Sequence, residues 1–299
     1  MSAAPAGGWR VPTPLLFAAA VLIWGTTWHA ILYQLAEATP EFGVTLRFGL
    51  AGLVVLAVAA WRGEALRRPW REHRVLALQG VFMYSLAYLC VYHAERHVPS
   101  GLVAVGYSAS PLLAGLGSWW LWRTPLSRRF VLGGVLGVLG VAAVFAPELG
   151  AAGARERADL GLLFTAAAVA LSAVGALSAS RNGARGLPFW TALGWGLLWG
   201  AAASAVVLLA SGQPLALPTA PSWWLSLAYL AVAGTVVAFA CFLALQQRVG
   251  PGPAATIGVM TPVVALAVSA LAEGYRPGPL AWAGGALAIV GNVLMLRRA

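Results

Sequence analysis

Apolar runs of about membrane-spanning length follow one another along nearly the whole chain. A helix needs about 20 apolar residues to cross the hydrocarbon layer of a bilayer, and each run is close to that length. Clusters of Arg, Glu, Pro and Gly, typical of helix ends and turns, separate the runs. The pattern predicts an all-α integral membrane protein without a soluble domain. The ten predicted transmembrane helices cover residues 12–35, 40–61, 75–94, 100–122, 130–147, 160–180, 188–211, 223–247, 253–272 and 279–296.

The second half of the chain repeats the first at an offset close to 150 residues. Residues 97–101 lead to Ser110-Pro111, and residues 248–252 lead to Thr261-Pro262, 151 positions later. The starts of the halves, 15–17 and 162–164, match at an offset of 147. Three glycines of the first half fall on glycines of the second at the offset of 151: Gly133, Gly134 and Gly140 on Gly284, Gly285 and Gly291.

This repeat predicts how the two halves lie in the membrane. If residues 1–149 and 150–299 hold five helices each, the two copies cross the bilayer in opposite directions. Inverted repeats are the architecture of alternating-access carriers, whose substrate site lies near the midplane between the copies. The first apolar run is repeated internally and exceeds the roughly 7–15 residues of a secretory leader core. We therefore expect the first run to be a retained helix.

Composition and charge exclude several classes of protein. Sixty per cent of the residues are apolar and 9% charged, with a mean hydropathy of +0.80, whereas soluble domains carry about 25% charged residues. The net charge of +10 comes from 19 Arg without any Lys. These arginines lie between apolar runs, so they indicate orientation in the membrane and not nucleic-acid binding.

The arginines also predict which ends of the helices face the cytoplasm. With the N-terminus inside, 14 of the 19 Arg lie in cytoplasmic segments, four in outer loops, and Arg47 within a span. Such a bias in short loops is the positive-inside signature. We expect a multi-pass protein of the bacterial inner membrane with both termini in the cytoplasm, acting as a monomer or weak homodimer.

Cysteine usage predicts neither a disulfide framework nor a metal site. Cys90 and Cys241 both lie inside apolar segments, where free cysteines usually act as small core residues. We expect no cofactor.

A stripe of tyrosines marks the third predicted helix. Tyr84, Tyr88 and Tyr92 recur every four residues and so share one helix face. A phenol facing lipid at mid-depth would leave its hydroxyl unpaired at a cost of a few kcal/mol. We predict that Tyr84 and Tyr88 line a cavity and that Tyr92 lies at the membrane interface, where aromatic residues gather.

Other aromatic and hydroxyl side chains gather on the first, fourth and ninth predicted helices. Trp24, Thr27 and Trp28 lie within one stretch of the first helix, where core packing and cavity lining are equally good interpretations. Proline frees a backbone carbonyl of its helix, and such a break is tolerated in a membrane only when it is buried or lines water. The two prolines with neighbouring hydroxyl groups predict two symmetric breaks near the midplane, at Tyr107, Ser108, Ser110 and Pro111 and at Thr261 and Pro262.

Few charged side chains fall inside the predicted helices. Arg47 lies roughly 10 Å below the outer surface at 1.5 Å per residue; it could bind a carboxylate, but we favour pairing with Glu41 or Glu273. His29 is interpreted as a core residue. Glu95 and Glu273 lie at helix ends, so no Asp or Glu is predicted at mid-depth. The pattern favours a facilitator or exchanger over a strongly proton-coupled pump.

The motifs together resemble a known family. Trp24-Gly25-Thr26-Thr27-Trp28 followed by Arg47, the two polar-Pro pairs, and Glu273 after the ninth helix are similar to EamA-type members of the drug/metabolite transporter superfamily, over about residues 12–297. The resemblance implies ten helices in two inverted repeats of five and export of small metabolites. The tyrosine-rich third helix most resembles YddG-type amino-acid exporters. Those commonly carry Tyr-Leu-Trp-Pro in the fourth helix, whereas residues 107–111 here lack the Trp.

The resulting hypothesis is an exporter of amino acids, aromatic and other neutral ones, that works by alternating access. The predicted substrate-binding residues are Trp24, Thr27, Trp28, Tyr84, Tyr88, Tyr107, Ser108, Ser110 and Thr261, and the predicted gating or structural residues are Arg47, Pro111, Pro262 and Glu273. A proton-coupled carrier of another small organic metabolite or drug is the alternative. An integral-membrane enzyme is less favoured, because the chain has no His-Glu-x-x-His pair and no Asp cluster.

Overall fold

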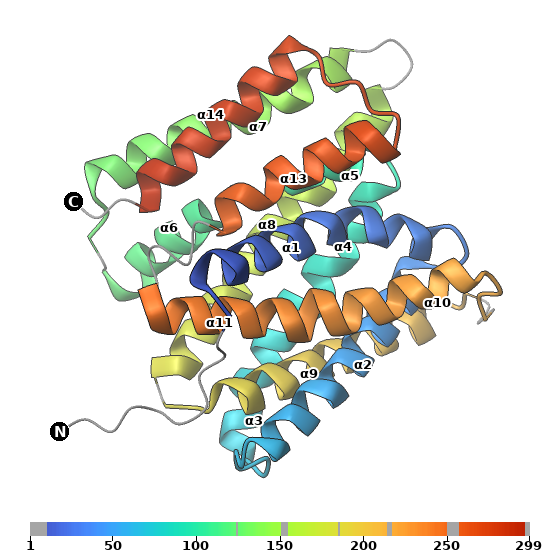
Figure 1. Ribbon diagram of the computed structural model, residues 1–299, viewed down its shortest axis with the longest axis vertical. Coiled ribbons are helices and arrows are strands. Elements are labelled where there is room, and N and C mark those ends of the chain that lie inside the picture. Colours follow the sequence, from blue (N-terminus) through green and yellow to red (C-terminus); the bar gives the residue numbers. More distant parts are fainter. Residues whose placement is uncertain are drawn as a thin grey trace.

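The computed structural model describes residues 11–123, 125–150, 155–184, 186–213, 217–249 and 257–296, and all its regular elements are helices (Figure 1). The first half contains α1 (Thr13–Leu35), α2 (Pro40–Trp61), α3 (Trp70–Gln79), η1 (Gly80–Leu86), α4 (Ala87–Glu95), α5 (Ser100–Tyr107), α6 (Ser110–Trp122) and α7 (Arg128–Gly150). The second half contains α8 (Arg155–Ala184), α9 (Phe189–Ala210), α10 (Pro221–Ala228), η2 (Tyr229–Val237), α11 (Ala238–Val249), α13 (Ile257–Ala272) and α14 (Pro279–Leu296).

Among the described residues, eight helical runs are long and apolar enough to cross a membrane, and α13 and α14 are shorter apolar helices. Proline sets several of the starting points, because it has no N–H to donate and suits the first turn of a helix. At α2, Pro40 follows Thr39, whose hydroxyl oxygen accepts a hydrogen bond from the Phe42 N–H at 3.3 Å. The chain is a multi-pass membrane protein built from helices.

The fourth predicted helix is broken, as the proline in it indicates. α5 ends at Tyr107, α6 begins at Ser110, and the turn at Ser108 and Ala109 separates them. Pro111 occupies the first turn of α6. The N–H groups of a first turn have no partner within the helix, so the missing N–H of proline costs no helical hydrogen bond there. The predicted helix 100–122 is therefore two helices.

The predicted second break, at Pro262, is wrong for the described residues. Pro262 lies inside α13, which runs without interruption from Ile257. Proline has no N–H to donate to the carbonyl four residues earlier, so the helix loses one internal hydrogen bond here. The Thr261 hydroxyl donates to the Ile257 carbonyl at 2.9 Å. Residues 250–256, where the predicted ninth helix begins, lie outside the described part.

Two segments of π-helix, which the sequence did not predict, occupy the third and eighth membrane-spanning runs. They are η1, between α3 and α4, and η2, between α10 and α11. In η2 the Thr235 hydroxyl donates to the Leu230 carbonyl, five residues earlier, at 3.1 Å. Such wide turns change which backbone and side-chain groups a helix presents, and they occur often at functional sites.

Glycines form the contact between α7 and α14, which lie side by side (Figure 1). A Cβ atom added to Gly133 would come within 2.4 Å of the Gly291 carbonyl oxygen, and one added to Gly140 within 2.6 Å of the Gly284 carbonyl oxygen. The two helices are therefore antiparallel and packed backbone to backbone, as small residues allow in membranes.

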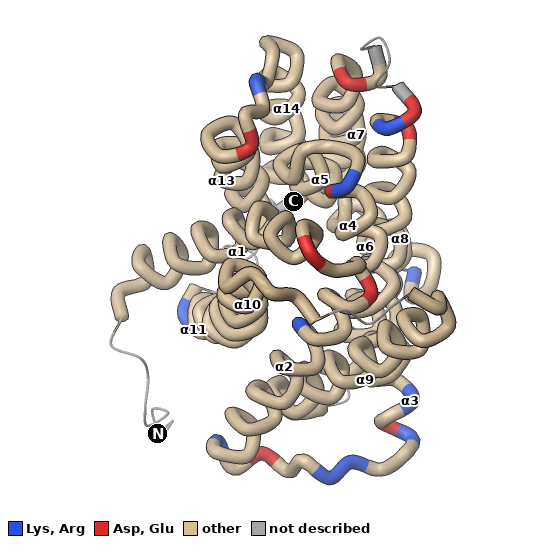
Figure 2. Tube along the Cα trace, turned by 90° about the vertical axis from the view of Figure 1, so that its right-hand side faces the viewer, with Lys and Arg blue, Asp and Glu red and all other residues tan. Residues whose placement is uncertain are grey.

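Every second connection between membrane-spanning runs lies at the same end of the molecule. At one end, the Glu64 carboxylate before α3 accepts the Thr191 N–H of α9 at 2.8 Å, and Arg248 donates to the Val11 carbonyl at 2.6 Å. At the other end, the Glu37 carboxylate between α1 and α2 accepts the Thr219 N–H before α10 at 2.7 Å. The arginines before α3 lie along the lower edge of Figure 2.

Glu273 joins three helices at the second of these ends. Its carboxylate accepts hydrogen bonds from the Ser100 N–H at 3.0 Å, from the Ser100 hydroxyl, and from the Ser269 hydroxyl at 2.8 Å. His29 Nδ1 lies 3.2 Å from the same carboxylate. The sequence placed Glu273 at the end of the ninth helix, and the structure gives it the role of connecting α13 to α1 and α5.

We expect Gly140→Ala to destabilise the protein, because the new methyl group would force α7 and α14 apart. The expected loss is roughly 1–3 kcal/mol of unfolding free energy, as for other overpacked sites. Gly137→Ala is the matched control on the same helix, since a Cβ there meets nothing within 4 Å. Thermal unfolding of both variants in detergent tests this; an equal melting temperature for the two would contradict the glycine contact.

We expect Glu273→Ala to lower unfolding free energy by roughly 2–3 kcal/mol, because it leaves several donors without an acceptor. Glu41→Ala is the control at the same end, since the Glu41 carboxylate pairs with a single side chain among the described residues, His93 Nε2 at 3.2 Å. Thermal unfolding should show the larger loss for Glu273→Ala. A larger loss for Glu41→Ala would show that Glu273 does not hold these helices together.

Candidate functional site

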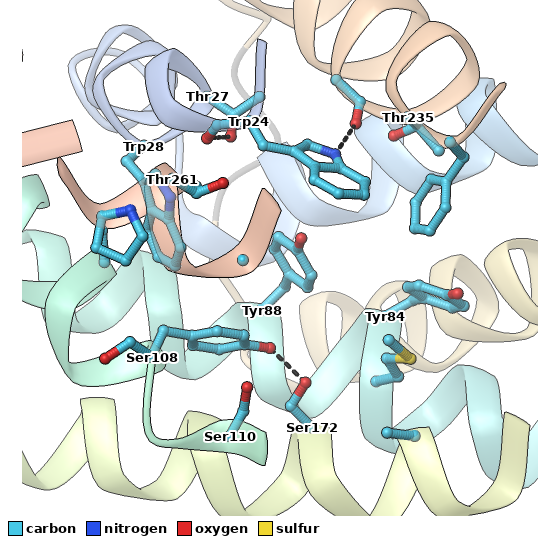
Figure 3. Close-up of a pocket in the computed structure, with 18 of the residues that line it drawn as sticks. Trp24, Thr27, Trp28, Tyr84, Tyr88, Ser108, Ser110, Ser172, Thr235 and Thr261 are labelled. Carbon is cyan, nitrogen blue, oxygen red and sulfur yellow. Dashed lines mark hydrogen bonds between the residues drawn. The ribbon is translucent and has the colours of Figure 1, made fainter. Parts of the chain in front are cut away.

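A cavity of about 450 Å³ lies between the two halves of the chain (Figure 3). Helices from both halves line it, including α1, η1, α8, η2 and α13. All nine residues that the sequence predicted for substrate binding line this one cavity: Trp24, Thr27, Trp28, Tyr84, Tyr88, Tyr107, Ser108, Ser110 and Thr261. Arg47, Pro111 and Pro262 line it too, whereas Glu273 lies outside it.

The two tryptophans of α1 form part of the cavity wall. The Trp24 indole N–H donates to the Gly234 carbonyl of η2 at 3.0 Å, so the π-helical segment fixes this ring (Figure 3). The Trp28 ring meets the Tyr107 ring edge to face, with centroids 5.5 Å apart. The sequence left core packing and cavity lining open for Trp24 and Trp28. In the structure both rings line the cavity.

The first two tyrosines of the third membrane-spanning run line the cavity as predicted. The Tyr84 hydroxyl accepts a hydrogen bond from Gln79 Nε2 at 3.5 Å. The Tyr88 ring packs edge to face on Phe48 of α2, with centroids 4.7 Å apart. The Tyr88 hydroxyl makes no hydrogen bond within the described part of the chain, so it is available to a ligand.

The prediction that Tyr92 lies at the membrane interface is wrong. Its side chain is fully buried, its hydroxyl donates to Gln34 Oε1, and it accepts from Arg47 at 3.5 Å. α2 carries Gly43 beside it, where a Cβ would come within 3.2 Å of the Tyr92 ring. The helices close over the end of the stripe, which the spacing of the tyrosines alone does not reveal.

Arg47 is buried beside the aromatic rings and is only 3% exposed. Its guanidinium carbon lies 4.8 Å from the centroid of Tyr88 and 5.1 Å from that of Phe48, within the range of cation–π attraction. The predicted pairing with Glu41 or Glu273 is wrong, because His93 and His29, respectively, lie against those carboxylates. Arg47 is the only charged residue among those described that line the cavity.

The hydroxyl groups of the cavity differ in how far their hydrogen bonds are satisfied. Those of Thr27 and Ser108 donate to carbonyls of their own helices, at 2.7 and 2.6 Å. Tyr107 donates to Ser172 of α8 (Figure 3). Ser110, like Tyr88, has no hydrogen-bond partner within the described ranges. The site therefore offers a buried cation, two free hydroxyls and several aromatic faces.

Several cavity residues were missed from the sequence. Thr235 and Phe239 follow Tyr84 and Tyr88 by the repeat offset of 151, so applying that offset to the tyrosine stripe would have found them. Ser172 is one of several hydroxyl residues in its apolar run and Asn292 is an isolated amide in another, so the sequence carries no signal that singles them out. Phe48 follows Arg47 directly and resembles any other apolar residue of α2.

The cavity suits binding more than covalent chemistry. Its described lining contains no His, Cys, Asp or Glu, and such groups perform most acid–base and nucleophilic steps. Within the described residues, no three His, Cys, Asp or Glu side chains gather as a metal site would need, and the two cysteines are free thiols. The arrangement can hold a small molecule that combines an anionic group with apolar surface.

Comparisons with known proteins show which family the chain belongs to. It is 26% identical to the "Uncharacterized transporter sll0355" of Synechocystis sp. over 97% of its length and 91% of that protein, and 26% identical to the "Uncharacterized inner membrane transporter YedA" of Escherichia coli (strain K12) over 87% and 83%. A crystal structure with 24% sequence identity superposes with a TM-score of 0.68 over 94% of this chain and 95% of that one, which shows a shared fold. The profile of the EamA-like transporter family matches twice, at residues 12–146 and 159–297. The chain therefore belongs to the EamA-like transporter family.

Proposed function

We propose that this transporter exports amino acids across the bacterial inner membrane by alternating access. In this proposal the ten helices form two inverted repeats, residues 1–149 and 150–299, and both termini lie in the cytoplasm. The cavity between the repeats is the substrate site. The observation that carries the proposal is the position of Arg47, a buried guanidinium among aromatic rings and the single charge of the described cavity lining.

The contact between α7 and α14 supports the inverted repeat. Gly133 corresponds to Gly284 and Gly140 to Gly291 at the offset of 151. In the fold, Gly133 meets Gly291 and Gly140 meets Gly284. Such an exchange of equivalent residues is what a two-fold axis between two antiparallel helices produces. The two π-helical segments, η1 and η2, also fall at corresponding places in the halves.

The cavity chemistry supports an amino acid as substrate. A guanidinium binds a carboxylate with charge-assisted hydrogen bonds, and Arg47 is the residue that can supply them. The π faces of Trp24, Trp28 and Tyr84 can attract an ammonium group. The apolar lining accommodates a neutral side chain, aromatic ones included. The similarity of the third helix to YddG-type amino-acid exporters also supports an amino acid as substrate.

Counterflow in proteoliposomes tests this function. The purified protein should exchange labelled phenylalanine or leucine for unlabelled neutral amino acids, and phenylalaninamide, which lacks the carboxylate, should compete poorly. If no amino acid of a full panel drives counterflow while another class of metabolite does, the proposed substrate class is wrong.

Arg47→Gln should raise the KM for amino acids about 10- to 100-fold, the loss expected for a hydrogen bond to a charged group. It should have a smaller effect on any substrate that lacks a carboxylate. Arg62→Gln removes the same charge at the end of α2, outside the cavity, and serves as the control. An unchanged KM in folded Arg47→Gln protein would exclude Arg47 as the carboxylate site.

A second candidate, a proton-coupled carrier, is favoured by Glu95. The sequence favoured a facilitator or exchanger because Glu95 lies at a helix end. In the fold its side chain is only 6% exposed, and neither carboxyl oxygen has a hydrogen-bond partner in the described part of the structure. Burial without a partner favours the neutral, protonated carboxyl.

Other ionisable groups at this end of the molecule bear on any pH dependence. They include His29, Glu41, Tyr92, His93, Arg96, His97, Arg157 and Asp159. His29 and His93 each lie against a carboxylate, Glu273 and Glu41 respectively. Glu95 differs from those two carboxylates because it has no such partner among the residues described.

If Glu95 binds the coupling proton, an imposed pH gradient should drive accumulation of substrate by the native protein. Glu95→Gln, which mimics the protonated form, should abolish accumulation and leave counterflow at a rate close to the native one. Glu41→Gln should keep both activities. Counterflow without gradient-driven accumulation in the native protein would instead establish the facilitator or exchanger.

A further inference from the structure

A second hollow lies on the outside of the bundle, between α3, α6 and α8. It has a volume of about 760 Å³ and is separate from the central cavity except that Ala173 of α8 lines both. Three arginines line it, Arg71 and Arg74 from α3 and Arg181 from α8. We call it the α3–α6–α8 groove.

The three arginines are not neutralised by neighbouring acids. No acidic side chain lines the groove within the described residues, and none of the three guanidinium groups forms an ion pair there. Arg68 nearby differs, because its guanidinium lies 2.7 Å from the carboxylate of Glu72. The groove therefore presents uncompensated positive charge that would attract an anion.

The rest of the groove is apolar and open to the surroundings of the bundle. Leu78 of α3 is 45% exposed, Leu121 of α6 51% and Val174 of α8 40%. Trp120 and Trp122, also exposed, lie at the end of α6. Tryptophan prefers the level of the lipid headgroups. An occupant would thus have its charged part beside the arginines and an apolar part along the Leu and Val side chains.

The groove also lies at the end of the molecule that the arginine distribution places in the cytoplasm. Arg71 and Arg74 lie in the first turns of α3, just after the connection that carries Arg62, Arg67 and Arg68. Basic pockets between transmembrane helices on the cytoplasmic side suit the headgroups of anionic lipids. Guanidinium groups bind phosphate oxygens with two parallel hydrogen bonds each.

We infer that the α3–α6–α8 groove binds an anionic phospholipid of the inner leaflet. The guanidinium groups of Arg71, Arg74 and Arg181 hold its phosphate, and an acyl chain lies along Leu78 and Val174. Because Ala173 lines both hollows, the bound lipid rests against the turn of α8 that forms a wall of the transport cavity. This site does not depend on which substrate is carried.

Native mass spectrometry of the detergent-purified full chain tests the site with two probes that have identical acyl chains, phosphatidylglycerol and phosphatidylcholine. The native protein should retain phosphatidylglycerol in preference. Replacing Arg71, Arg74 and Arg181 together by Gln should weaken its binding at least about tenfold, since each arginine near an anionic lipid contributes a factor of about five. The triple variant Arg62→Gln, Arg67→Gln, Arg128→Gln removes the same charge outside the groove and should keep the preference.

A variant of unchanged charge separates the groove from general attraction. Val174→Trp fills the apolar wall and should also reduce retention of phosphatidylglycerol, with folding checked by circular dichroism. Millimolar inorganic phosphate should not displace the lipid, because it lacks the acyl chain. Equal retention of both lipids by the native protein, equal losses in the two triple variants, or displacement by phosphate would each overturn the assignment.

Discussion

The constraint on which the rest of this structure depends is that a backbone inside a bilayer must satisfy its own hydrogen bonds. Irregular backbone is tolerated there only where protein or a water-filled cavity surrounds it. The fold obeys this rule at three irregular segments of its described part. The break at Ser108 and the π-helical segments η1 and η2 all border the central cavity. In η2 the Gly234 carbonyl is also hydrogen-bonded at the cavity, because it accepts the indole N–H of Trp24.

Close helix packing places these irregular segments around one cavity. Gly80 of η1 lies against the backbone of α9, where a Cβ would come within 2.3 Å of the Gly196 carbonyl oxygen. α7 and α14 meet through glycines in the same manner. Helices with large side chains at these positions could not approach so closely. The arrangement gives a polar, aromatic cavity at the centre and leaves the more exposed arginines at the ends of the helices.

Much of this could be predicted from the sequence, because hydropathy, proline and the repeat are local signals. They predicted the apolar helices, the break at Pro111 and the residues around the cavity. The environment of Tyr92 and the partners of Arg47 could not be predicted, since both depend on how α1, α2 and α4 meet. The helix around Pro262 is continuous, so a proline in the sequence did not by itself locate a break. Burial of Glu95 likewise follows from packing and not from its place at a helix end.

The central claim is that the two halves insert in opposite directions around the cavity. Arg67 follows α2 and Gln213 follows α9, at corresponding places in the two halves. The direct measurement is labelling of single cysteines at these two positions with a membrane-impermeant maleimide in intact cells, after Cys90 and Cys241 are replaced by Ala. The inverted arrangement predicts that only the cysteine at position 213 is labelled from outside. Labelling of both positions, or of neither in cells whose lysates label fully, would contradict it.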